Sequence, residues 1–237
     1  MNPSKESEVL GLLKQVDLKD TIIAPSFAHL SLVQKKIKKA KLAAQDMSAE
    51  NPQNTAASTG EISASMLKNI GVKYVIIGHS ERRGMGDTDA LISSKIKLCL
   101  KEKMLPILCV GEGVRDHDMF YYNSVKTQLL EDLKNVSRVD LKKVIIAYEP
   151  VWAIGNSAKR EATPEECQEM VIFIKKVISD KFGSKSLNDI KIIYGGSVNP
   201  KNAADFLTVG GADGLLVGRS SLDPKKFYEI YQTTQNG

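Results

Sequence analysis

Long apolar runs are missing from this 237-residue sequence. The longest ones, such as the run that starts at Val144, are far shorter than the roughly 18 residues that a membrane-spanning helix needs. The first ten residues also lack the basic segment and the apolar stretch of a secretory signal. We therefore expect a protein that makes no membrane contact and works in the cytoplasm.

Cysteine is scarce, and the charges of the two signs nearly balance. Cys99, Cys109 and Cys167 show no C-x-x-C spacing, which argues against a disulfide framework or a zinc site and favours reduced thiols. Lysine and arginine number 33 against 28 aspartates and glutamates, a net charge of only +5. The lysines clustered at 35–41 are interleaved with apolar residues as on a solvated helix face, so we expect no nucleic-acid partner.

Hydrophobic residues make up 42% of the chain and charged residues 26%. This composition supports a sizeable core and excludes a disordered or coiled-coil protein. No stretch reads as a linker, and α/β barrels reach about 250 residues as one domain. Residues 1–237 are therefore expected to form a single domain.

Seven short runs rich in β-branched residues predict the strands. Because these runs are continuously apolar rather than alternating, they are typical of a parallel sheet that is covered on both faces. Their spacing averages about 32 residues, the length of a βα repeat, which leaves an eightfold α/β barrel or a doubly wound sheet. The runs lie at 21–24, 41–44, 74–77, 106–110, 144–148, 190–194 and 214–218.

Helix start signals lie between the runs. Thr163-Pro164 places a capping residue before a proline and two acidic residues, and Asp223-Pro224 and Asn199-Pro200 repeat that pattern. The sequence from Asn2 to Val16 also has the pattern of a helix. Because an α/β barrel normally starts with a strand, we expect a truncated barrel that begins with a helix and lacks its first strand.

Polar residues and glycines follow the runs, at the edge where an α/β barrel carries its active site. His79 and Glu149 each directly follow a run. Taken singly, His79 could be a structural histidine and Glu149 the partner of a lysine. Together, a carboxylate base and a neutral imidazole donor could move a proton next to a carbonyl. Glycine turns at 195–196 and at Gly218 would let backbone N–H groups approach a phosphate, so small phosphorylated substrates are expected.

Six motifs carry a resemblance to a known family. In their order along the chain they closely resemble triosephosphate isomerase. Another phosphate-binding barrel isomerase or synthase would explain only the last two of them. The motifs are TGE at 59–61, HSERR at 79–83, PILCVGE at 106–112, YEPVWAIG at 148–155, YGGSVNP at 194–200 and LVGRSSLDP at 216–224.

This resemblance implies a (β/α)8 barrel and an isomerase of glycolysis and gluconeogenesis. The family interconverts dihydroxyacetone phosphate and D-glyceraldehyde 3-phosphate through an enediolate, as a homodimer or larger homo-oligomer, without metal or cofactor. The implied residues are Glu149 as the base, His79 as the electrophile, Glu81 and Cys109 beside them, Gly155, Ser197, Gly218 and Arg219 as phosphate-binding N–H donors, and Thr59, Gly60, Glu61 and Arg82 at the dimer interface.

The sequence departs from the family in its first strand, whose Asn-x-Lys motif is not found. Loss of one preorganised group of this kind costs on the order of 10² to 10³ in rate. We therefore expect weak or lost activity. The alternative is a catalytically silent barrel that binds phosphate ligands or serves as an assembly module. The missing strand should leave two edges unpaired, which favours distortion or pairing with another chain.

Two smaller departures concern the phosphate site. Residues 150–155 would suit the start of a lid that closes over the site to exclude water. The end of this lid at 156–161 is longer than is usual in the family and lacks the family's second glycine. Arg219 replaces a glycine, so a positive φ at this position would be strained. A further hypothesis is that Arg219, Lys159 or Arg160 replaces the missing lysine.

Overall fold

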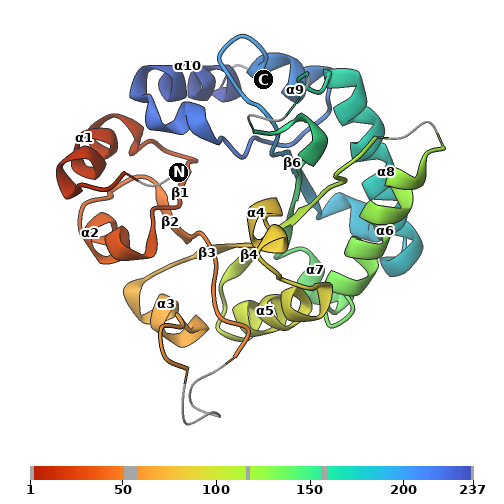
Figure 1. Cartoon of the computed structure of the whole chain (residues 1–237), viewed down its shortest axis with the longest axis horizontal. Helices are drawn as coiled ribbons and strands as arrows, with labels where there is room; N and C mark the ends of the chain where they lie inside the picture. The colour runs from red at the N-terminus through yellow and green to blue at the C-terminus, as the bar shows by residue number, and fades with distance from the viewer. Residues whose placement is uncertain (1–2, 51–57, 116–117, 156–157, 159, 236–237) are drawn as a thin grey trace.

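The computed structural model describes residues 3–50, 58–115, 118–155, 158 and 160–235. Six parallel strands pair in chain order into one curled sheet, and helices surround it (Figure 1). This is the architecture of a TIM-type α/β barrel, as predicted. The strands are β1 (Ile22–Ile23), β2 (Lys41–Ala44), β3 (Tyr74–Ile77), β4 (Leu105–Val110), β5 (Ile145–Tyr148) and β6 (Lys191–Tyr194).

The seventh predicted strand is present only as a single bridge. Leu215 pairs with Tyr194 of β6, and the rest of the run at 214–218 forms no named strand. Among the described residues the sheet order runs from β1 to β6 without a pairing that closes the ring. A segment with a neighbour on one side alone makes only half of its ladder bonds, which explains why this run stays irregular.

Helices form the outer layer, and they cover the open side of the sheet as well. α1 and α10, from the two ends of the chain, pack against each other (Figure 1). None of the described helices is long and apolar enough to cross a membrane. The α-helices are α1 (Glu6–Val16), α2 (Leu30–Gln34), α3 (Ala64–Ile70), α4 (Ser80–Gly84), α5 (Asp89–Lys101), α6 (Phe120–Asp132), α7 (Arg138–Leu141), α8 (Pro164–Phe182), α9 (Ala203–Thr208) and α10 (Pro224–Gln235). Short 3₁₀ turns are η1 (Phe27–His29), η2 (Val151–Ala153), η3 (Ser184–Asn188) and η4 (Arg219–Leu222).

Two of the predicted helix starts are confirmed and one is wrong. The Thr163 hydroxyl accepts from the N–H of Glu166, whose carboxylate accepts from the N–H of Thr163, so α8 begins with a complete capping box. α10 begins at Pro224, as expected. The Asn199 side chain accepts from the N–H of Lys201, as Asp223 accepts from the N–H of Lys225 at the start of α10, but residues 200–202 form a turn and α9 begins only at Ala203.

The core has two parts, which explains the continuously apolar strands. Ile146 of β5 packs in the large cluster between sheet and helices, whereas Ala147 next to it packs inside the barrel. Successive side chains of a strand face opposite sides, so a strand that is covered on both sides has no polar face. All three cysteines are buried and unpaired, as the sequence predicted.

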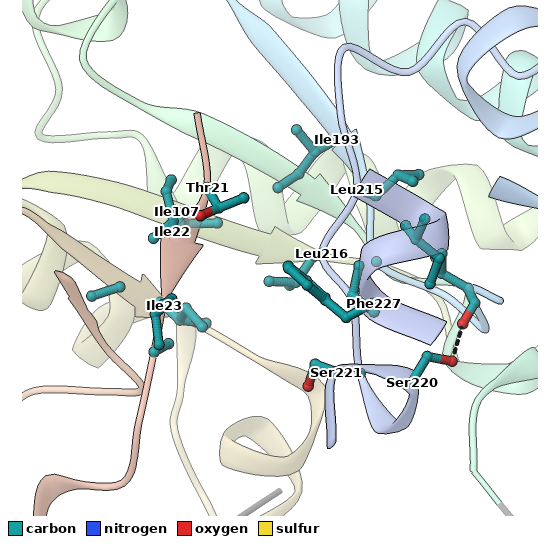
Figure 2. A pocket seen from close by; sticks show the side chains of 18 of the residues that line it. Thr21, Ile22, Ile23, Ile107, Ile193, Leu215, Leu216, Ser220, Ser221 and Phe227 are labelled. Carbon is teal, nitrogen blue, oxygen red and sulfur yellow. Dashed lines mark hydrogen bonds between the residues drawn. The ribbon is translucent and has the colours of Figure 1, made fainter. Parts of the chain in front are cut away.

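A cavity of about 1380 Å³ occupies the open side of the sheet. Ile22 and Ile23 of β1 line one wall, and Leu215 and Leu216 line the other (Figure 2). Phe227 of α10 lies at the same opening. The predicted gap is therefore present, and its walls are largely apolar.

Thr163→Ala should lower the free energy of unfolding by about 1 kcal/mol, because the N–H of Glu166 loses its acceptor. Urea denaturation followed by circular dichroism measures this loss. Thr208→Ala is the control, since the Thr208 hydroxyl only bonds back to the Ala204 carbonyl within α9, and it should stay within about 0.5 kcal/mol of the wild type. Equal losses in the two variants would contradict the capping assignment.

Candidate active site

The carboxylate of Glu149 is buried directly after β5. Its side chain is only 2% exposed. Oε2 accepts from the backbone N–H of Ser80 at 2.9 Å, and the Cys109 thiol also bonds to the carboxylate. Among the described residues no donor makes an aligned hydrogen bond to Oε1. Burial raises the pKa of Glu149, although His79, Ser80 and Cys109 favour its charged form.

The imidazole of His79 faces that carboxylate in a defined tautomer. Nδ1 accepts from the backbone N–H of Glu81 at 3.2 Å, which places the ring proton of a neutral imidazole on Nε2. Nε2 lies 3.1 Å from Oε1 of Glu149. The His79 side chain is 32% exposed and lines the large cavity. A buried acceptor and a proton donor therefore lie side by side at the mouth of the barrel.

Glycine is required beside Glu149. A Cβ on Gly111 would overlap the carbonyl oxygen of Glu149, and a Cβ on Gly195 would lie 3.1 Å from Cγ of Glu149. Any side chain at Gly111 would thus push β4 and β5 apart at their carboxyl ends. The close approach of these two strands keeps water away from the carboxylate.

The predicted phosphate-binding residues gather around the same cavity. Gly155, Ser197, Gly218 and Arg219 all line it, together with His79. Gly155 has a φ of +84°, which favours glycine at that position. The expected strain at Arg219 is not found, because this residue lies in the 3₁₀ turn η4 and does not have a positive φ.

Trp152, in the segment that was expected to start a lid, is anchored by a buried carboxylate that the sequence analysis did not assign. Glu112 accepts from Nε1 of Trp152 at 2.7 Å and from the Tyr148 hydroxyl at 2.9 Å. Further along the same segment, Arg160 lies over the Trp152 ring and donates two hydrogen bonds to the carboxylate of Glu166. Arg160 is thus held away from the role of a replacement cation, and Lys159 and residues 156–157 lie outside the described residues.

The predicted interface residues lie at the surface. Thr59, Gly60 and Glu61 are exposed. Arg82 is half-buried and pairs with Asp46 and Asp87. Glu81 is also exposed and lines the cavity, whereas Cys109 is fully buried against Glu149.

The family model for triosephosphate isomerase matches residues 4–234. The chain belongs to the triosephosphate isomerase family. The chain is 40% identical to the triosephosphate isomerase of Chloroherpeton thalassium over 98% of its own length and 92% of that relative. It is likewise 40% identical to the enzyme of Dictyoglomus thermophilum, over 95% of the chain and 90% of the relative. It is 42% identical to that of Flavobacterium psychrophilum over 88% and 83%.

Several residues of this triosephosphate isomerase family member were missed by sequence reasoning because they act through the backbone or at a distance. Ser80 was missed, because it holds Glu149 by its backbone N–H and the residue type gives no sign of such a contact. Glu81, which the sequence analysis named, holds His79 in the same way. Gly111 could have been found, because it directly follows a strand run. Glu112 could have been found too, since a carboxylate at a strand end is unusual in a buried sheet.

Gly111→Ala should lower the free energy of unfolding by about 3 kcal/mol, because the added methyl group overlaps backbone that cannot yield. Gly113→Ala is the matched control, since nothing lies within 4 Å of a Cβ at that position, and it should change stability by less than about 0.5 kcal/mol. Urea denaturation of both variants tests the close approach of β4 and β5. A Gly111→Ala protein as stable as Gly113→Ala would rule it out.

Proposed function

We propose that this chain, acting as one domain, interconverts dihydroxyacetone phosphate and D-glyceraldehyde 3-phosphate with Glu149 as the base and His79 as the electrophile. The observation that carries this proposal is the 3.1 Å approach of His79 Nε2 to Oε1 of Glu149. One of these atoms can donate a proton and the other can accept one. Family membership supports a phosphorylated triose as the substrate.

The proposed reaction moves two protons, one between neighbouring carbons and one between their oxygens, and needs no oxidant. Glu149 Oε1 removes a proton from the carbon next to the substrate carbonyl, and the electron pair moves onto the carbonyl oxygen. Nε2–H of His79 stabilises the negative charge on this oxygen, donates its proton to it and then takes up the proton of the neighbouring hydroxyl. Glu149 returns the first proton to the former carbonyl carbon, so the carbonyl and the hydroxyl exchange places.

We also propose that the substrate phosphate binds at backbone N–H groups of Gly155, Ser197, Gly218 and Arg219. All four residues line the cavity that His79 lines. Backbone N–H groups of glycines and at the start of a 3₁₀ turn can approach an anion closely. This arrangement supports a small phosphorylated ligand whose reacting carbons lie over Glu149.

We further propose that turnover is weak. The only lysine among the described residues that line the cavity is Lys191, which lies at the start of β6 and pairs with Asp213. The start of a parallel strand is the end opposite to His79 and Glu149. Without a lysine beside the developing oxyanion, the rate should fall on the order of 10² to 10³ below that of a family member that carries one there.

Turnover of D-glyceraldehyde 3-phosphate by the purified chain, compared with Glu149→Ala prepared in the same way, tests the function. We expect slow isomerisation by the wild type and a further loss of at least about 10² in Glu149→Ala, because the base is removed. Glu149→Ala, purified identically, controls for contaminating host enzyme, and Thr208→Ala, which should keep the wild-type rate, controls for the effect of a substitution as such. Equal background rates for the wild type and Glu149→Ala would favour the catalytically silent barrel.

The pH dependence of the same assay gives a second readout. Glu149 must be deprotonated to act as a base, and burial raises its pKa above the ordinary value of 4.5. The value of kcat/KM should therefore be full at high pH and fall on acidification, with the loss starting above pH 4.5. A wild type that stays fully active at pH 4.5 would contradict Glu149 as the base.

We propose that the protein self-associates as a homodimer or a larger homo-oligomer, and that it works in the cytoplasm. Thr59, Gly60 and Glu61 are exposed in one short segment, and the negative charge of Glu61 acts on Arg82. The unpaired edges beside the cavity offer a second surface for association. Three buried, unpaired cysteines are compatible with a reducing compartment.

Thr59→Arg should shift the protein toward its 26.0 kDa monomer, because a bulky cation at a tightly packed interface adds repulsion and overlap. Analytical ultracentrifugation of the wild type should show at least a dimer. Thr208→Arg, which adds the same side chain on exposed α9, is the control and should leave the mass unchanged. A monomeric wild type would refute the proposed association.

A further inference from the structure

Arg83 has no role in the mechanism, yet its guanidinium lies behind the catalytic pair. The side chain is only 18% exposed. Nε donates to the carbonyl of Gly78 at 2.8 Å, and Nη2 donates to the carbonyl of Cys109 at 3.1 Å. Gly78 directly precedes His79, and the Cys109 thiol bonds to Glu149. One side chain thus joins the two strand ends that carry groups of the active site.

These two carbonyls lie just beyond the last register pair of the two strands. The ladder between β3 and β4 ends at Ile77 and Leu108. At the next step Gly78 turns away with a φ of +76°. Nη2 of Arg83 lies 3.1 Å from the position that a Cβ on Gly78 would take. The guanidinium therefore lies where the next hydrogen-bonded pair of the ladder would be.

Two carboxylates hold the guanidinium in this orientation. Nη2 donates to Oδ2 of Asp132 in α6, and Nη1 donates to Oδ1 of Asp89 in α5, both at 2.6 Å. The Asp132 side chain is completely buried, and its other oxygen has no hydrogen-bond partner among the described residues. Burial raises the pKa of Asp132 to about 7, and the guanidinium opposes that rise. Asp132 therefore depends on the guanidinium to keep its negative charge.

The same bonds fix α4, whose first amides hold both catalytic side chains. The N–H of Ser80 donates to Glu149, and the N–H of Glu81 donates to Nδ1 of His79. Arg83 reaches back from the same short helix to Gly78, so α4 cannot rotate without breaking this bond. We propose that Arg83, together with Asp132, is a positioning residue that holds His79 in its Nε2–H tautomer opposite Glu149.

This inference rests on the proposed function for its kinetic readout only. A buried ion pair can often be replaced by apolar side chains of similar shape without loss of stability, whereas removal of one partner leaves a buried charge. The double variant Arg83→Met/Asp132→Leu therefore removes the carbonyl bonds and leaves no fully buried charge, since the remaining carboxylate of Asp89 is 31% exposed. Arg115→Met is the matched control, because Arg115 is an equally buried arginine that pairs with Glu166 and Glu169.

The first measurement is the tautomer of His79 by ¹⁵N NMR, which the chain makes simple because it contains three histidines. We expect a pure Nε2–H form in the wild type and in Arg115→Met. In Arg83→Met/Asp132→Leu we expect a mixture of tautomers at His79 and no change at His29. An unchanged His79 in a folded double variant would overturn the proposal, even if the wild type has no isomerase activity.

The second measurement is the split between kcat and KM. A displacement of about 1 Å between reacting groups costs on the order of 10² in rate, so kcat of the double variant should fall by about that factor while KM stays within about twofold. If the double variant does not fold, Arg83→Lys tests the positioning role instead. One ammonium cannot bond to two carbonyls and two carboxylates at once. Arg83→Lys with native kcat and a native His79 tautomer would overturn the proposal. A wild type without turnover would refute the proposed function and leave the NMR result to decide the role of Arg83.

Discussion

The arrangement of the active site depends on the burial of one carboxylate. Glu149 is removed from water where β4, β5 and β6 pack side by side, and a charge in that place is stable only because Ser80 and Cys109 donate to it. Ser80 is the first residue of α4, just beyond β3, and Cys109 lies near the end of β4. The buried carboxylate therefore exists only when three neighbouring strands end at the same level, which a parallel barrel provides and a loosely packed sheet does not.

Glycine makes that convergence possible. Gly111 lets the β4 end lie against the Glu149 carbonyl, and Gly78 turns the chain so that His79 points into the mouth. Arg83 then occupies the space that a Cβ on Gly78 would approach. Small residues and one large cation are complementary here, because the glycines bring the backbone carbonyls within reach of a single guanidinium.

The sequence could bring His79 and Glu149 together because each lies just after an apolar run, and parallel strands bring such positions to one edge. It could not predict the Arg83–Asp132 pair, whose members lie 49 residues apart with no local pattern that links them. It overestimated the run at 214–218, where Leu215 alone pairs, with Tyr194, because this run lies at the open edge of the sheet. At Asn199-Pro200 the capping bond to the N–H of Lys201 is present, but a turn precedes the regular helix, which begins at Ala203.

The open side of the sheet borders other strands than those that precede His79 and Glu149. The gap should therefore affect some parts of the proposed site more than others. β3, β4 and β5 have neighbours on both sides, so the ladder that holds His79 and Glu149 is complete. The gap borders β1 and the segment that leads to Gly218 and Arg219. It belongs to the same cavity that His79 and the proposed phosphate-binding residues line. An unclosed barrel should therefore weaken phosphate binding and the exclusion of water more than it disturbs the geometry of proton transfer.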